Sequence, residues 1–187
     1  MFSDQELVKM TLKGNKNSFD EIVLRYSTKV YSLILRMLRD PTLAEDLTQD
    51  TFLRAYRSLD KYNPVYPFNN WILKIASNLC IDNIRKSKNV AFSDSDTELS
   101  LVQQNVFVDP QEAILDKEAS QELARALTIL PAKYRLVILL RYLEGLKYEE
   151  IATVLEEPLG TIKTKLYRAR GLLKDYLFNK KEGEFGE

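Results

Sequence analysis

Apolar residues in the first ninety positions recur at spacings of three and four, which is the period of an amphipathic helix. The longest such series begins at Phe19 and ends at Leu38, just before Pro41. The pattern therefore predicts three helices, over about residues 19–38, 42–59 and 69–88. Between the second and third, the segment Asp60–Phe68 contains two prolines and is predicted to be a loop.

The helical period disappears after residue 88 and returns near residue 110. Residues 89–108 are rich in Ser, Asp, Gln and Asn, which is typical of a flexible linker. Asp109 and Pro110 then resemble an N-cap followed by proline at the first helical position. Two more helices are expected, at about 110–129 and 132–144, separated by Pro131 and closed by Gly145.

No alternating strand pattern exceeds a few residues, so the predicted fold is all-α, with two small helical domains on a tether. The expected boundaries are a first domain at 1–90, a linker at 91–109, a second domain at 110–180 and a tail at 181–187.

The end of the second domain has the pattern of a helix-turn-helix. A short helix after Tyr148 carries Ile151, Ala152 and Leu155 on one face, and a break follows at 156–158. The next helix has one apolar stripe at spacings of four, three, four and three, formed by Ile162, Leu166, Ala169, Leu173 and Tyr176. Thr161, near the start of this helix, can help to cap it. In such a pair the second helix enters the major groove of DNA.

The opposite face of that second helix is basic, with Lys163, Lys165, Tyr167, Arg168 and Arg170. Lys and Arg can bind phosphates and guanine edges, while Thr and Tyr can contact base edges or backbone. A basic amphipathic helix is more often an ordinary solvated face. Here the density of charge, seven Lys or Arg and one acidic residue over Leu159–Lys181, and the tight break before it favour a DNA-reading helix.

Composition excludes several classes of site. The chain has no histidine, and Cys80 is its single cysteine. A disulfide framework and a Cys/His zinc site are therefore excluded, and the commonest general base is missing. We expect no catalytic residue, no metal site and no cofactor. The N-terminus lacks the layout of a signal peptide, and no apolar run reaches the length of a membrane span, so a cytoplasmic protein without membrane insertion is expected.

The net charge of zero conceals an uneven distribution. Residues 1–90 carry 14 basic and 10 acidic side chains, residues 91–118 carry one and seven, and residues 119–187 carry 12 and 10. Two basic segments thus flank an acidic connector. Because salt screens charges beyond about 8 Å, a nucleic acid responds to the local charge and not to the total.

Three polar groupings in the first domain suggest binding surfaces. On the 42–59 helix, one face carries Asp46, Gln49, Asp50, Leu53 and Arg57, which suits a basic protein partner or is simply solvated.

Aromatic residues gather in and after the loop: Tyr62, Tyr66, Phe68 and Trp71, with Lys61 beside them. Such rings can stack on unpaired bases. Phe68 and Trp71 can instead close the core, so Tyr62 and Tyr66 are the better candidates.

Along the 69–88 helix, Lys74, Asn78, Asp82 and Arg85 form a polar stripe. Asn can recognise adenine, and Lys and Arg can bind phosphate. Asp82 and Arg85 can also simply pair with each other.

Taken together, these residues resemble the bacterial sigma-70 family, and specifically the short extracytoplasmic-function sigma factors. The segments FDEIVLRYSTKVYSLILRML, AEDLTQDTFLRAY and FNNWILKIASNLCIDNIRK are similar to sigma domain two. LPAKYRLVILLRYLEGLKYEEIATVLEEPLGTIKTKLYRARGLL is similar to sigma domain four. The resemblance covers nearly the whole chain and implies a promoter-specificity subunit, not an enzyme.

The resemblance also implies roles for individual residues. The AEDLTQDTF helix would grip the clamp helices of the largest subunit of core RNA polymerase through Asp46, Gln49, Asp50 and Leu53. The flap region of the polymerase is a further implied contact of the protein. The −10 element would be captured by Lys61, Tyr62, Tyr66, Phe68, Lys74, Asn78 and Arg85. The −35 element would be read by Thr161, Lys163, Tyr167 and Arg168, with Lys165 and Arg170 on phosphates. An anti-sigma factor is a further implied partner.

Two departures from the family pattern and two rival functions remain. The first departure is the acidic, unpatterned tail Gly183–Glu187, which has no family role. Glu156 and Glu157 fill a turn where the family often has a small residue followed by an apolar one, and Glu157 would repel a phosphate. A stand-alone helix-turn-helix repressor or activator explains the second domain but gives the first no role. A helical hydrolase with a carboxylate metal site, built on Glu45, Asp46, Asp50 and Asp82, is disfavoured by the absence of histidine.

Overall fold

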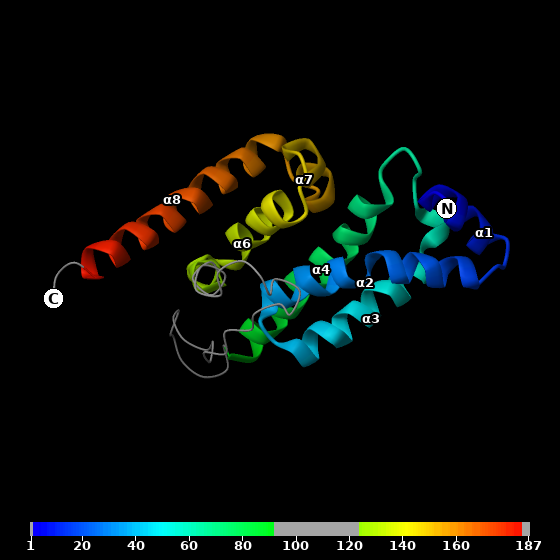
Figure 1. The fold of residues 1–187 in the computed structure, drawn as a ribbon, viewed down its shortest axis with the longest axis horizontal. Coiled ribbons are helices and arrows are strands. Elements are labelled where there is room, and N and C mark those ends of the chain that lie inside the picture. Colours follow the sequence, from blue (N-terminus) through cyan, green and yellow to red (C-terminus); the bar gives the residue numbers. More distant parts are fainter. Residues whose placement is uncertain (1, 92–123, 185–187) are drawn as a thin grey trace. The chain divides into compact units, whose positions relative to one another are not determined.

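The computed structural model describes residues 2–91 and 124–184 (Figure 1). These residues form helices and no strand, which confirms the predicted all-α fold. They belong to two compact units, one built on the chain up to Ala91 together with the short stretch Thr153–Glu156, and the other on the rest of the helices after residue 123. The predicted linker after Ala91, and residues 110–123 of the expected helix at 110–129, lie outside the described residues.

The first unit contains four α-helices and a short 3₁₀ turn. They are α1 (Asp4–Leu12), α2 (Asn17–Leu38), α3 (Pro41–Arg57), η1 (Leu59–Lys61) and α4 (Phe68–Ala91). The three predicted helices are confirmed within a few residues. The first helix, α1, was not predicted, although Ser3 and Glu6 form a complete capping box at its start.

The turn between α2 and α3 is fixed by local chemistry. Arg39 ends α2 with a left-handed backbone (φ 62°), and its N–H donates to the Leu35 carbonyl oxygen at 2.7 Å. The Asp40 side chain then accepts from the Leu43 N–H at 3.0 Å, and Pro41 occupies the first turn of α3. Both features are strong signals for the start of a helix.

The core of this unit lies where α2 packs on α3 and α4, which also pack on each other (Figure 1). Its fully buried side chains include Ile22, Val30, Leu33, Ile34, Ala55, Phe68, Ile72, Leu73, Ala76 and Cys80. The apolar stripes of the three helices therefore meet as their period predicted.

The second unit begins in the described region with helical residues 124–129. It continues with α6 (Ala132–Ile138), the π-helical turn η3 (Leu139–Leu143), α7 (Tyr148–Leu155) and α8 (Leu159–Glu184). Arg135 joins the first two segments, because its Nε donates to the Leu127 carbonyl at 2.9 Å and its Nη2 to that of Leu130 at 3.1 Å. The helix α8 continues to Glu184, beyond the expected domain end at residue 180.

Candidate nucleic-acid interface

The helices α7 and α8 form the predicted helix-turn-helix. The turn uses a left-handed Glu156 (φ 53°), and the Glu157 N–H donates to the Ala152 carbonyl at 3.0 Å. Helix α8 begins after Pro158, whose carbonyl accepts from the N–H groups of Thr161 (2.9 Å) and Ile162 (3.2 Å). Thr161 is thus already in the first turn of α8, and the expectation that it caps the helix is wrong.

The inner face of α8 is the predicted apolar stripe. Ile162, Leu166 and Ala169 are at most 1% exposed, and α8 packs on α6. Burial of these three side chains fixes which face of α8 is left for a partner. That outer face carries Lys163, Tyr167, Arg168 and Arg170, all exposed.

Lys165 and Arg170 of α8 form hydrogen bonds within the protein. Lys165 Nζ donates to both carboxylate oxygens of Glu157 at 2.6 Å. Arg170 Nε donates to the Leu166 carbonyl at 3.2 Å, which leaves its terminal nitrogens outside this bond. Lys165 therefore carries a charge that Glu157 balances within the protein, so a phosphate at this place would meet the ion pair and not a lone cation.

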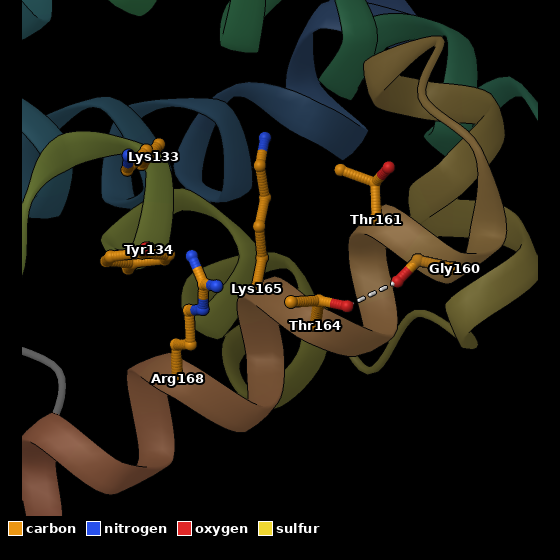
Figure 2. Close-up of a pocket in the computed structure, with 7 residues that line it drawn as sticks. All are labelled: Lys133, Tyr134, Gly160, Thr161, Thr164, Lys165 and Arg168. Carbon is orange, nitrogen blue, oxygen red and sulfur yellow. Dashed lines mark hydrogen bonds between the residues drawn. The ribbon is translucent and has the colours of Figure 1, made fainter.

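A pocket of about 320 Å³ lies between the start of α6 and the first turns of α8. Figure 2 shows its lining: Lys133 and Tyr134 from α6, and Gly160, Thr161, Thr164, Lys165 and Arg168 from α8. Thr164 Oγ1 donates back to the Gly160 carbonyl at 2.9 Å. The pocket brings three cationic side chains together, of which Lys165 is paired with Glu157. Lys133 and Arg168 are the two that suit an anionic group.

Tyr134 links the cations of this pocket. The Lys133 Nζ lies 5.1 Å from the centre of the Tyr134 ring, within the range of a cation–π interaction. A hydrogen bond from Arg168 lowers the pKa of the Tyr134 hydroxyl below its usual 10.0, because the guanidinium stabilises the phenolate form. Sequence reasoning missed Lys133 and Tyr134. The only signal was their place directly after Pro131, at the start of a helix.

A second polar surface lies on α3. Asp46, Gln49 and Leu53 are exposed, with Leu53 at 55%, while Thr51, Phe52 and Ala55 face the core. The carboxylate of Asp50 accepts from Arg54 Nε at 3.1 Å, one turn along the helix. The structure therefore brings the predicted residues to one face and shows that Asp50 is already paired. Tyr56 remains 43% exposed, with its ring edge-on to Phe19.

The loop before α4 differs from the prediction. Tyr62 is only 8% exposed and Phe68 only 1%. Their rings lie 5.3 Å apart, and each is 5.4 Å from the ring of Trp71. This burial contradicts the expectation that Tyr62 and Phe68 stack directly on unpaired bases. The reason is that these rings pack against one another beneath the loop and form its small apolar core.

The exposed part of this loop is its tip. Lys61 is exposed, Tyr66 is 49% exposed and Val65 is 81% exposed. The polar stripe on α4 continues from there, and Asn78, Asp82 and Arg85 on it are exposed. Lys74 occupies the same stripe one turn before Asn78. The available candidates for contact with a single strand are thus Tyr66, Lys61 and the polar stripe.

The described parts of the chain contain neither a metal-binding cluster nor a membrane-spanning helix. No three His, Cys, Asp or Glu residues there gather closely enough to hold a metal ion. No helix in those parts combines the length and the apolar character that crossing a membrane requires.

Comparison with known proteins relates both units to one family. Residues 22–90 match the model of sigma-70 region 2, and residues 120–173 match that of sigma-70, region 4. The ECF RNA polymerase sigma factor SigW of Bacillus subtilis is 36% identical over 176 residues, covering 91% of this chain and 94% of SigW. The RNA polymerase sigma-H factor of Pseudomonas aeruginosa is 32% identical over 178 residues, covering 89% and 90%.

Solved structures show the same likeness. The sigma factor RpoE of Bartonella quintana, determined in complex with the anti-sigma factor NepR, aligns with a TM-score of 0.71 at 25% identity. That alignment covers 85% of this chain and 96% of RpoE. CnrH, solved with the cytosolic domain of CnrY, shares the fold, with a TM-score of 0.68 at 23% identity over 94% of this chain and 97% of CnrH.

Proposed function

Because the chain belongs to the extracytoplasmic-function sigma factors of the sigma-70 family, which give RNA polymerase its promoter specificity, we propose that its two helical units divide this work. The second unit binds the −35 element as duplex DNA. The first unit binds core polymerase and traps an unpaired base of the −10 element. Transcription then begins where both elements occur at the correct spacing.

The −35 interface is the outer face of α8 together with the α6–α8 pocket. Lys163, Tyr167 and Arg168 are exposed and reach base edges, and Thr161 lies at the helix start. Arg170 contacts the DNA backbone. Lys133 in the pocket adds a cation for a phosphate beside the groove, which fixes the register of α8.

The core polymerase interface is the stripe of Asp46, Gln49, Asp50 and Leu53 on α3. An acidic and amide face with one exposed leucine complements a basic helical surface such as the clamp helices of the largest subunit. The second unit contacts the flap region of the same enzyme.

The −10 interface is the loop tip and the stripe on α4. Lys61 and Tyr66 lie at the loop, and Lys74, Asn78 and Arg85 continue along the helix. Tyr62 and Phe68 act beneath it as buried support. A flipped base costs a few kcal/mol of lost stacking, which contacts made only with an unpaired base offset.

The protein acts as an initiation factor in the cytoplasm, without catalytic activity of its own. Its regulator is an anti-sigma factor that masks the two DNA-binding units. The RpoE–NepR complex supports this, because RpoE aligns over 85% of this chain.

The observation that carries the proposal is that both sigma regions match, in the family's order, on the two helical units. A stand-alone helix-turn-helix regulator would account for the second unit alone. The test is run-off transcription with core polymerase on a random promoter library. Transcripts should come from templates that share two motifs at a fixed spacing. A product pattern identical to that of core polymerase alone would contradict the proposal.

A further inference from the structure

Helix α1 is firmly attached to the first unit. Leu7 and Val8 are 2% and 5% exposed, and they pack this helix on α2. The Asp4 carboxylate accepts one hydrogen bond from Arg25 Nη1 and another from the Tyr26 hydroxyl, both at 2.5 Å. The two hydrogen bonds of Asp4 thus hold the first turn of α1 on α2, and the buried Leu7 and Val8 hold the next turn.

The next residue of that turn reaches the loop before α4. Gln5 Nε2 donates to the Pro64 carbonyl oxygen at 2.9 Å, across 59 positions of the sequence. Helix α1 also packs on η1, from which the loop departs. Helix α1 therefore holds the main chain of the loop at Pro64, in the middle of the loop.

The two sides of the loop are held from within. The Tyr62 hydroxyl donates to the Tyr66 carbonyl at 2.7 Å, and the Asn63 side chain accepts from the Val65 N–H at 3.0 Å. The Tyr62 ring rests on Phe68 and Trp71. These bonds close the loop on itself. Among the contacts of the described residues, the Gln5 bond is the one that ties the tip of the loop to another helix.

We propose that Gln5 is a positioning residue for promoter opening: it holds the loop of residues 62–67 in the shape that receives the unpaired −10 base. This inference rests on the proposed function of that loop. A loop that is ordered before binding loses less conformational entropy when the strand arrives. Gln5 thereby raises the rate of strand capture and the selectivity for the captured base, without contacting DNA.

The first experiment uses the free full-length protein and a built-in reporter. Trp71 is the single tryptophan of the chain and contacts the Tyr62 ring. Gln5→Ala removes the amide, and Gln5→Glu keeps its size but removes the donor. Both should increase acrylamide quenching of Trp71 fluorescence at an unchanged thermal midpoint. Lys9→Ala, one turn along the same helix and exposed, is the matched control and should change nothing.

The second experiment measures opening with core polymerase. On duplex promoter, Gln5→Ala and Gln5→Glu should open about two- to tenfold more slowly, the range of one hydrogen bond. The ratio of opening rates between the preferred base and the other bases at the captured position should fall by a similar factor. A pre-melted template should restore the rate but not the preference. Tyr62→Phe, which removes only the bond to the Tyr66 carbonyl, should act in the same direction.

Parental base preference in both Gln5 variants would overturn the inference, as would equal defects in Lys9→Ala. Parental quenching of Trp71 would also overturn it, because the loop would then be ordered without Gln5. If the parental protein itself showed no preference at any −10 position, the proposed function would fail instead. The quenching result would still show whether Gln5 orders the loop.

Discussion

The carboxylate of Glu157 accepts two hydrogen bonds from the Nζ of Lys165, each 2.6 Å long, at the turn that leads into α8. A negative charge at this turn opposes a DNA phosphate, and it also neutralises the lysine that would bind one. Glu157→Gln should therefore strengthen binding to every duplex alike. The slope of log K against log salt should steepen by about 0.9, the value for one added phosphate contact.

The control for this variant is Asp175→Asn, which makes the same charge change on an exposed residue farther along α8. Fluorescence anisotropy with cognate and scrambled duplexes, over a salt series, measures both. Equal gains for the two variants would attribute the effect to net charge alone. Lys165→Ala should weaken binding to every duplex in the parental protein as well, because it leaves the Glu157 carboxylate at this turn without its partner.

Cys80 makes the stability of the first unit sensitive to alkali. Burial raises the pKa of its thiol from 9.0 to about 12. The unfolded thiol ionises near pH 9 while the folded one stays protonated, so the unfolded state loses the proton first. Stability should fall between about pH 9 and 12, with this group contributing about 1.4 kcal/mol per pH unit.

Cys80→Ala isolates that contribution, because every other group titrates in both proteins. Urea unfolding followed by Trp71 fluorescence at pH 8 to 10.5 should give a shallower pH dependence for the variant. Parallel pH profiles for the two proteins would show that the thiol does not carry the linkage. At pH 8, below the titration of the unfolded thiol, the variant should be less stable than the parental protein, because it leaves a cavity.

Charge reversal on α3 tests the polymerase interface. Asp46→Arg should weaken binding of core polymerase about tenfold or more, because a like charge would meet a basic partner. Asp46 is the sharper choice, since Asp50 already pairs with Arg54. Glu45→Arg, the same change on the same helix but off the stripe, is the control. Titration of labelled protein with core polymerase measures both, and equal losses would remove this stripe from the interface.

The positions and buried faces of the long helices could be predicted from the sequence, because the spacing of apolar residues determines both. The stripe Ile162–Leu166–Ala169 and the turn at Pro158 could be read directly. The exposed face of α3 followed in the same way, since the opposite face had to enter the core. Helix α1 was not predicted although its Ser3–Glu6 capping signal is present, because a helix of 9 residues is too short to show a clear period of apolar positions.

Contacts between residues distant in sequence could not be predicted. Tyr62 stands in a polar, proline-containing segment, so the sequence suggests an exposed side chain. Only the structure shows that its ring packs on Phe68 and Trp71. Nothing in the sequence places Lys133 beside Arg168, because that proximity depends on how α6 crosses α8. The residue types of a loop predict that the chain turns there. Whether a loop side chain is buried depends on the helices that the loop packs against.

Single alanine changes on α8 separate base reading from backbone binding. Lys163→Ala and Arg168→Ala should each cost about 1–3 kcal/mol on the cognate −35 duplex and relax the preference at one position. Both side chains are exposed on the outer face. Lys174→Ala, two to three turns beyond them on α8, should leave the preference unchanged. Equal losses on cognate and scrambled duplexes would assign Lys163 and Arg168 to phosphates.

The last prediction concerns strand capture by α4. Asn78 is exposed on the polar stripe of this helix, and its amide can pair with a base edge only after the base leaves the duplex. Asn78→Ala should slow open-complex formation while core polymerase binding and −35 binding stay at parental values. Permanganate footprinting of the −10 segment measures the opening.

A pre-melted bubble template should reduce the opening defect of Asn78→Ala, because the cost of unpairing has already been met. It should not restore discrimination at the captured base, since the contact is still missing. Asn83→Ala, on another side of α4, is the matched control and should open at the parental rate. If Asn78→Ala opened the duplex at the parental rate and with the parental base preference, Asn78 would have no part in reading, and the loop around Tyr66 would be the reader by itself.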